Sequence, residues 1–459
     1  MATGALFGGT GLSGGWRPPV RRLAAFALRD TNVVVGAVIA NNFLRAVSSV
    51  ILTRLFVPEV FGIAGIIGSA AFVLAMLSDL GFQAFVVRHA DAERPEFADT
   101  IWTIALLRSL VLTIALAALS WPIASLMNKP DLWPLLAVSS LTFLLEGTAS
   151  LSLILALRRR MVLRLSLLEF AVAVAQLVAA VALAFVWRSY WAILVAMLLS
   201  TTFKSVMSYA MFRGSRHRLR FERKYAGELW RFARFVTGSS IMMMLVLQCD
   251  KLVLARVMPL DAFGFYMLAC NLGLAPLAFT TAYASRVLYP AYAEVARDGS
   301  RDMRAFFYEK RRAVGALYML AAGGLIGCAP LLVAVLYDER YADAGLYLRL
   351  IALTTLFAFS SSSANEVLTA TGRIQVTLQA SAIKLGWLAV AGPVGFVWGG
   401  AIGLVLAVGL MELPAMLLRW WQLGRYGLLR LGEEGAMLVV GGAGIALGLL
   451  LNALALPLV

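Results

Sequence analysis

Residues 52–62 read LTRLFVPEVFG, and residues 254–264 read LARVMPLDAFG. The first stretch starts at residue 52 and the second starts at residue 254, 202 positions later. Both have arginine as the third residue and end with Phe-Gly. Each stretch lies between two long apolar segments of the chain. The repeat predicts two related halves in which equivalent segments occupy equivalent positions.

The rest of the chain consists mostly of apolar segments. Its residues are 61% hydrophobic and 14% charged, and its mean hydropathy is +0.83, which is typical of a polytopic membrane protein. About thirteen segments are long enough to cross a ~30 Å hydrocarbon layer as helices. These predicted spans are residues 31–53, 60–86, 98–125, 132–156, 163–187, 189–212, 235–257, 261–289, 313–337, 346–370, 375–398, 400–421 and 435–458.

The basic residues between these segments gather at every second loop. Of the 40 lysines and arginines, 29 lie in the set of loops that includes the N-terminus, six lie in the opposite set, and five lie inside segments. The positive-inside rule therefore predicts a cytoplasmic N-terminus. The opposite set comprises Arg54, Lys129, Arg188, Arg256, Arg340 and Arg349.

The repeat and the segments together predict an all-α membrane protein. Because six segments separate the two repeated stretches, both halves have the same orientation and a pseudo-two-fold axis along the membrane normal. We expect a cytoplasmic N-terminal segment (1–30), a six-helix bundle (31–212), a cytoplasmic amphipathic linker (213–234), a second six-helix bundle (235–421) and an additional transmembrane helix (422–459). In the linker, Tyr225, Leu229 and Phe232 follow helical spacing for the membrane interface, although its charges alone also explain it as a topology signal.

No pattern of a catalytic or cofactor site is visible. The chain lacks a phosphate-binding loop, a dinucleotide fingerprint and a nucleophile elbow, and its three cysteines and two histidines form no metal-ligand cluster. We therefore expect no enzyme activity, cofactor or metal. Topology and anionic lipid explain the net charge of +15 better than nucleic-acid binding does.

Charged residues inside the apolar segments are the remaining functional candidates. A charge in hydrocarbon costs at least ~2.5 kcal/mol, so such residues face a cavity or a partner. The candidates for substrate binding are Arg45, Arg108, Lys204, Lys251 and Lys384, with Arg45 and Arg108 preferred. The candidates for ion coupling are Asp79, Glu146, Glu169, Asp250, Glu366 and Glu412. The alternative is that several of these charges form structural salt bridges, as the adjacent pair Asp250-Lys251 suggests.

Several stretches, in order, resemble one family. Residues 52–62 are similar to its R-L-x-x-P-x-x-F-G pattern, and residues 78–88 (SDLGFQAFVVR) to D-L-G-x-x-x-A-x-x-x-R. Further resemblances are DKLVL (250–254) with FGFY (263–266), VLYP (287–290) and, more weakly, LTATGR (368–373). The chain thus resembles the O-antigen and exopolysaccharide repeat-unit flippases of the multidrug/oligosaccharidyl-lipid/polysaccharide (MOP) exporter superfamily. Such proteins have 12 or 14 spans, whereas about thirteen are predicted here.

The resemblance implies a function in polysaccharide biosynthesis at the bacterial inner membrane. It implies a flippase that moves undecaprenyl-diphosphate-linked oligosaccharides for exopolysaccharide or lipopolysaccharide assembly by alternating access, with a polymerase and a co-polymerase as candidate partners. A basic cavity between the two bundles would suit the diphosphate. The alternatives are a cation or drug antiporter of the same superfamily and a non-transporting subunit of a polysaccharide assembly complex.

Overall fold

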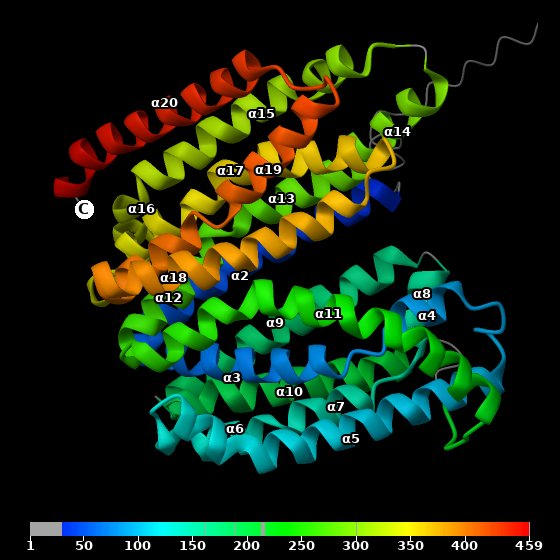
Figure 1. The fold of residues 1–459 in the computed structure, drawn as a ribbon. Helices are drawn as coiled ribbons and strands as arrows, with labels where there is room; N and C mark the ends of the chain where they lie inside the picture. Colours follow the sequence, from blue (N-terminus) through cyan, green and yellow to red (C-terminus); the bar gives the residue numbers. More distant parts are fainter. Residues whose placement is uncertain (1–29, 160, 188, 213–215, 300, 459) are drawn as a thin grey trace, which may run out of the picture.

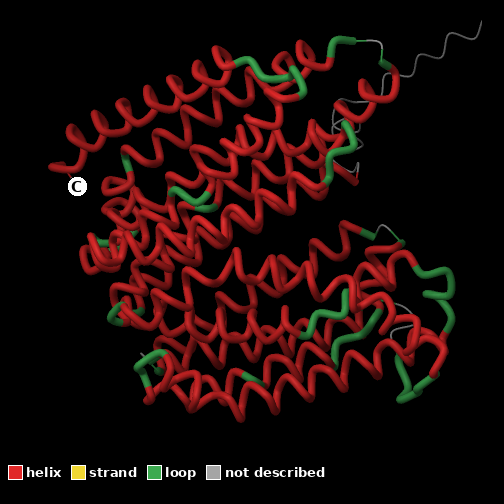
Figure 2. Tube along the Cα trace, viewed as in Figure 1, coloured by secondary structure: helices red, strands yellow, loops and turns green. Residues whose placement is uncertain are grey.

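Helices make up the whole regular structure of the chain in the computed structural model, which describes residues 30–159, 161–187, 189–212, 216–299 and 301–458. Over these residues no strand occurs (Figure 2). Figure 1 shows the helices in two groups, with α3 to α11 below and α12 to α20 above. The expectation of an all-α protein is confirmed.

The first group contains the helices of the first half and also α11, whose last part begins the second half of the sequence (Figure 1). Its helix α2 packs mainly on α9 and makes only a small contact with α12 of the other group. The bounds are α2 Asp30–Leu55, α3 Pro58–Leu77, α4 Phe82–Arg88, α5 Pro95–Leu126, η1 Pro130–Leu132, α6 Trp133–Ser139, α7 Leu141–Gly147, α8 Ser152–Arg158, α9 Val162–Val186, α10 Tyr190–Ala210 and α11 Arg223–Val257.

The second group contains the remaining described helices of the chain. The bounds are α12 Leu260–Gly273, α13 Ala275–Tyr283, η2 Ala284–Leu288, α14 Tyr289–Asp298, α15 Met303–Gly327, α16 Ala329–Leu336, η3 Glu339–Tyr341, α17 Ala344–Ala370, α18 Gln375–Gly409, α19 Glu412–Arg425, α20 Leu431–Ala455 and η4 Leu456–Leu458. Helix α18 contains a kink, because Gly399 and Gly400 leave the helical conformation.

The helices match the predicted segments well in position. Each predicted segment overlaps a helix or a consecutive run of helices. In the described residues, eight helices are long and apolar enough to cross a membrane, or up to ten if each of two bent pairs is one span. The bends are 56° between Pro130–Gly147 and Ser152–Arg158, and 71° between Met303–Gly327 and Ala329–Leu336. Among these eight, the stretch Gln375–Arg425 is counted as one span, although it contains the α18 kink at Gly399 and Gly400.

The two repeated stretches pack directly on each other where α3 meets α12. A Cβ atom on Gly62 would overlap the carbonyl oxygen of Leu260, and one on Gly264 would overlap that of Pro58. Pro58 and Leu260, like Gly62 and Gly264, are 202 positions apart, so each half repeats the contact of the other. Such reciprocity is the signature of a two-fold axis. Glycine is required because the two backbones touch.

The last helix, α20, is docked along α15. Cβ atoms on Gly323 and Gly327 would overlap the backbone of α20, which is the close approach that small residues allow in membrane proteins. An ion pair between the fully buried Arg311 and Glu434 adds a second link, and an exposed pair of 2.6 Å joins Arg312 to Glu433. The additional helix is thus an integral part of the second group.

The predicted linker is divided by the start of α11. Residues 1–29 and 213–215 lie outside the described residues, but residues 223–234 form the first turns of α11. Tyr225 and Leu229 are buried in a cluster with Phe85 and Phe97, so this apolar face packs against protein. Of the two interpretations of this segment, the helix in the membrane interface is the less favoured, because its apolar face packs against protein.

Candidate substrate-binding site

Three of the predicted charged residues line one cavity. This cavity of about 300 Å³ lies within the first group, and Arg108 on α5, Glu146 on α7 and Lys204 on α10 face it. Trp102 and Phe143 add aromatic walls, as in sites that hold polar groups in apolar surroundings. We call it the first-group cavity.

Close packing of α7 on α5 brings these side chains together. A Cβ atom on Gly147 would collide with Ser109, so only glycine allows the two helices this approach. Helix α7 ends at Gly147, and just beyond it Thr148 hydrogen-bonds Ser205 on α10 at 3.0 Å. The break in the fourth predicted span therefore positions Glu146 between Arg108 and Lys204.

Arg108 has a second task at the end of α3. Its Nε donates to the Ser78 carbonyl and one Nη to the Ala75 carbonyl, both at 2.8 Å. These carbonyls belong to the last turn of α3, where no helical partner exists, and a cation there also favours the helix dipole. Arg108 thus supports the structure while its guanidinium stays in the cavity wall.

Lys204 and Glu146 carry charges that are not committed elsewhere. Among the described residues, neither takes part in an ion pair or a side-chain hydrogen bond, and Lys204 is half-buried while Glu146 is exposed. A half-buried ammonium without a partner is the group in this cavity most available to an anionic ligand.

Asp79 is held by the turn that connects α3 to α4. Its carboxylate accepts from the Gly81 N–H at 2.9 Å and from Ser240 on α11 at 2.7 Å. Gly81 has φ +65°, a left-handed conformation that glycine adopts without strain. The Asp-Leu-Gly sequence therefore builds a turn and ties it to α11.

Two predicted cations lie near the contact between the two groups. Arg45 is exposed on α2 and donates to Asn271 Oδ1 on α12 at 3.2 Å. Lys251 lies 3.3 Å from Asp250 and donates to the Leu247 carbonyl at 2.6 Å. The buried Asp250 also accepts a hydrogen bond from the Tyr266 hydroxyl, which ties α11 to α12.

Lys384 belongs to a buried cluster in the second group. It lies 2.5 Å from Glu412, which also pairs with Arg419 at 3.2 Å and accepts from Ser361 at 2.6 Å. Glu366 is half-buried on α17, and Glu169 is exposed on α9. The structure therefore brings Arg108, Lys204 and Glu146 together and distributes the other candidates over separate places.

Sequence reasoning missed a set of contacts that joins the halves at one end. Lys129, after α5, donates to the Ala255 and Met258 carbonyls at 2.5 and 3.0 Å. In the other half, the buried Tyr341 donates to the Phe56 carbonyl at 2.7 Å, and Arg340 reaches the Thr53 carbonyl at 3.5 Å. We call these contacts the latch.

The latch repeats across the two halves. Its acceptors in the first half, Thr53 and Phe56, are each 202 positions before Ala255 and Met258, the acceptors in the second. In each half the donor comes from the loop after the third helix-forming region and binds the exposed carbonyls at the end of the other half's first long helix. The chain offered one signal: Lys129 and Arg340 are among six cations in otherwise cation-poor loops.

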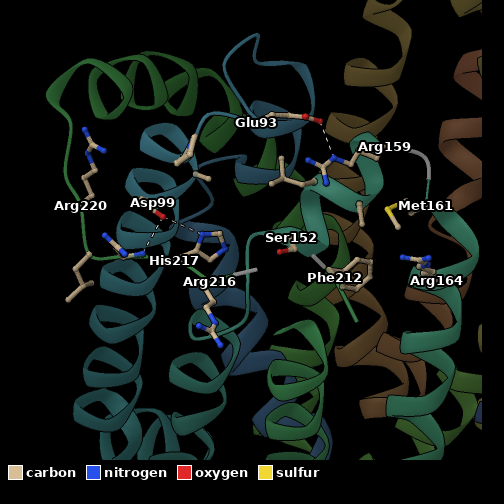
Figure 3. Close-up of a pocket in the computed structure, with 16 residues that line it drawn as sticks. Glu93, Asp99, Ser152, Arg159, Met161, Arg164, Phe212, Arg216, His217 and Arg220 are labelled. Atoms are coloured by element: carbon tan, nitrogen blue, oxygen red, sulfur yellow. Dashed lines mark hydrogen bonds and ion pairs between the residues drawn. The ribbon is translucent and has the colours of Figure 1, made fainter. Parts of the chain in front are cut away.

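A larger cavity lies at the opposite end of the first group. It has a volume of about 830 Å³ and is lined by Arg159, Arg164 and Arg216 together with the buried His217 (Figure 3). The His217 Nε2 accepts from the Leu151 N–H at 3.1 Å, so the ring proton is on Nδ1, 3.5 Å from Asp99. Burial lowers the pKa of His217, and Asp99 opposes that effect.

Comparisons with known proteins agree on the family. The sequence model of the polysaccharide biosynthesis protein family matches residues 51–345. The lipopolysaccharide biosynthesis protein WzxC of Escherichia coli (strain K12) is 23% identical over 82% of this chain and 77% of its own length. The succinoglycan biosynthesis transport protein ExoT of Rhizobium meliloti (strain 1021) is 24% identical over 68% of this chain and 62% of its own.

Solved structures share the fold at low identity. The lipid II flippase MurJ, in an inward closed conformation, has a TM-score of 0.72 and 12% identity over 91% of this chain and 92% of its own. An inward-facing multidrug resistance MATE family transporter of the MOP superfamily has a TM-score of 0.58 and 15% identity over 84% and 94%. The predicted MOP-like fold is confirmed.

Proposed function

The chain belongs to the polysaccharide biosynthesis protein family, and from that premise we propose that it moves undecaprenyl-diphosphate-linked oligosaccharides across the bacterial inner membrane. The observation that carries this proposal is the family match, which spans most of both halves of the repeat. The relatives are named for lipopolysaccharide biosynthesis and succinoglycan transport, and the fold is shared with a lipid II flippase. Lipid II is itself a lipid-linked glycan, so the proposed cargo belongs to the same chemical class.

The protein is a multi-pass protein of the inner membrane, and we propose its orientation from charge. The end with most cations, where α4, α8 and α14 lie, faces the cytoplasm under the positive-inside rule. The latch then closes the periplasmic end. We also propose residues 31–212 and 235–421 as the two bundles, with the reciprocal Gly62–Gly264 contact as support.

The first-group cavity supplies the chemistry that such a cargo needs. Diphosphate is recognised by cations, and Lys204 with Arg108 offers two of them beside hydroxyl and aromatic groups for sugar. Glu146 lines the same cavity and takes part in no ion pair among the described residues, so among the candidate coupling carboxylates it is the one that faces the proposed cargo site.

Alternating access follows from the latch. With the latch closed, cargo enters from the cytoplasmic leaflet; breaking it would open the periplasmic side while the prenyl chain stays in the bilayer. The proposal includes no covalent chemistry. Polymerase and co-polymerase partners would receive the flipped unit on the periplasmic side.

The competing functions make different demands. A cation or drug antiporter would need a cavity dominated by carboxylates, whereas the first-group cavity has two cations against one carboxylate. A non-transporting subunit would need neither the latch nor the cavity charges to work.

The test is glycan export in cells that depend on this chain. Lys204→Gln should abolish export at a normal membrane level, because Gln keeps length and polarity but not charge. Arg108→Gln should reduce both export and protein level, because it also removes the hydrogen bonds from the guanidinium to the Ser78 and Ala75 carbonyls. Arg425→Gln, an exposed arginine of α19, is the control. Full export with Lys204→Gln would overturn the assignment of the cavity.

A further inference from the structure

The large cavity beside His217 has an excess of arginine. Five arginines line it against two carboxylates, Glu93 and Asp99. The lining arginines are Arg159, Arg164, Arg216, Arg218 and Arg220. It is formed by the start of α5, the end of α8, the start of α9 and the chain segment before α11 (Figure 3). Its lining residues are different from those of the first-group cavity.

Both carboxylates are already occupied. Glu93 accepts from Arg159 at 3.0 Å, and this hydrogen bond lowers the pKa of Glu93, so the carboxylate is firmly charged. Asp99 faces His217 and accepts from the Arg218 backbone N–H at 3.2 Å. Both carboxylates therefore interact with groups of the cavity wall, Glu93 with Arg159 and Asp99 with His217.

Among the described residues, the guanidinium groups of three lining arginines take part in no ion pair, those of Arg164, Arg216 and Arg218. Arg164 and Arg216 are exposed to the cavity region (Figure 3). Like charges in one cavity raise its positive potential, and an anion relieves that repulsion. The planar fork of a guanidinium matches a phosphate with two parallel hydrogen bonds.

The rim of the cavity continues into an apolar surface. Next to Arg164, the side chains of Leu163, Leu167 and Phe170 are exposed on one face of α9, with exposed fractions of 46%, 53% and 40%. An arginine set at the boundary between such a face and water is the arrangement that binds the headgroup of an anionic lipid at the cytoplasmic surface.

We propose that this cavity is a second ligand site for phosphoryl groups, with Arg164 on one side of the cavity and Arg216 on the other (Figure 3). The phosphoryl group can belong to an anionic membrane lipid or to a soluble diphosphate. The site shares the Ser150–Ser152 turn with the first-group cavity, because Ser152 lines the large cavity while Ser150 lines the smaller one. A ligand bound in the large cavity would therefore lie against the turn at the bend in the fourth predicted span. The inference does not require the proposed transport function.

The test titrates the purified full-length protein in detergent with two probes in parallel. One probe is phosphatidylglycerol, detected as bound lipid by native mass spectrometry with phosphatidylcholine as the reference; the other is inorganic pyrophosphate, followed by calorimetry. The double variant Arg164→Gln/Arg216→Gln should bind at least one probe about tenfold more weakly than the wild type, the effect of losing one charge-assisted hydrogen bond. Selective loss for the lipid identifies a headgroup, and loss for pyrophosphate identifies a soluble ligand.

Two further variants make the result specific. The pair Arg164→Lys/Arg216→Lys keeps the charge but not the fork, so its affinity should lie between wild type and the Gln pair. Arg425→Gln removes an exposed cation of the same end, and its affinity should equal that of wild type. Equal binding by the wild type and the Gln pair, or no binding of either probe by the wild type, would overturn the proposal.

Discussion

Opening of the latch is the first prediction. The double variant Lys129→Gln/Tyr341→Phe removes one donor in each half without changing side-chain volume greatly. Lys129 makes two close hydrogen bonds to carbonyls of the other half, at 2.5 and 3.0 Å, and Tyr341 makes one of 2.7 Å.

The expected size of the effect follows from these contacts. A hydrogen bond from a charged donor contributes about 1.5–3 kcal/mol and a neutral one about 1 kcal/mol. Because Lys129 is half-buried, we take about 2 kcal/mol for it, so the double variant loses about 3 kcal/mol of closure free energy. That changes the ratio of closed to open molecules by about a hundredfold. An open state populated at about 1% would rise to about half of the molecules.

The assay measures the distance between the halves at the latch end. Nitroxide labels are attached at Asp131→Cys and Glu339→Cys, which are exposed and lie on opposite halves, in a protein whose three native cysteines have been replaced. Electron–electron double resonance then measures the distance between the two labels. The double variant should gain a long-distance population that wild type lacks.

A matched control makes the same chemical change inside one half. Tyr318→Phe removes a buried hydroxyl that donates to the Thr355 carbonyl at 3.1 Å, with both residues in the second group. It should leave the distance distribution unchanged. The reasoning is refuted if the latch variant and Tyr318→Phe give the same distribution.

Three other perturbations follow from the packing and charges. Glu412→Gln leaves the half-buried Lys384 and the buried Arg419 uncompensated, so it should destabilise the protein by about 3–5 kcal/mol, seen as a large fall of Tm in detergent. Gly327→Ala pushes a Cβ into the α20 backbone and should cost about 1–3 kcal/mol, with earlier proteolysis after residue 430; unchanged proteolysis would exclude the docking role. For His217, whose pKa is lowered from 6.5 by burial beside Asp99, the contribution to stability is complete above pH 6.5 and is lost as pH falls through the lower folded pKa. Tm measured from pH 8 to pH 5 should therefore fall more for wild type than for His217→Asn.

The elements that could be predicted from the sequence are those set by local pattern. Apolar segments of span length became helices because backbone groups in hydrocarbon must bond within the segment. The repeat predicted equivalent positions for the two stretches but not their contact, which the structure shows where Gly62 and Gly264 lie against each other's backbone. Gly323 and Gly327, four positions apart, lie on one face of α15, and α20 packs on that face.

The pairing of charges could not be predicted. Helical spacing tells which face a residue lies on, but not which distant helix lies opposite, so the partner of Lys384 could not be read from the chain. Arg108 binds backbone carbonyls, and Lys129 does the same; because every residue has a carbonyl, such acceptors leave no trace in sequence. The contact between His217 and Asp99 could not be predicted either, because 118 positions separate the two residues in the sequence.

The most direct test of the central claim is movement of the cargo by the purified protein. A fluorescent undecaprenyl-diphosphate-linked oligosaccharide is placed in proteoliposomes, and the fraction that reaches an impermeant reagent outside is followed over time. The account predicts that wild type exposes the cargo initially held in the inner leaflet, whereas Lys204→Gln leaves it protected and Arg425→Gln behaves as wild type. Equal protection of the cargo with wild type and with protein-free liposomes, for an oligosaccharide of the native producer, would contradict the account.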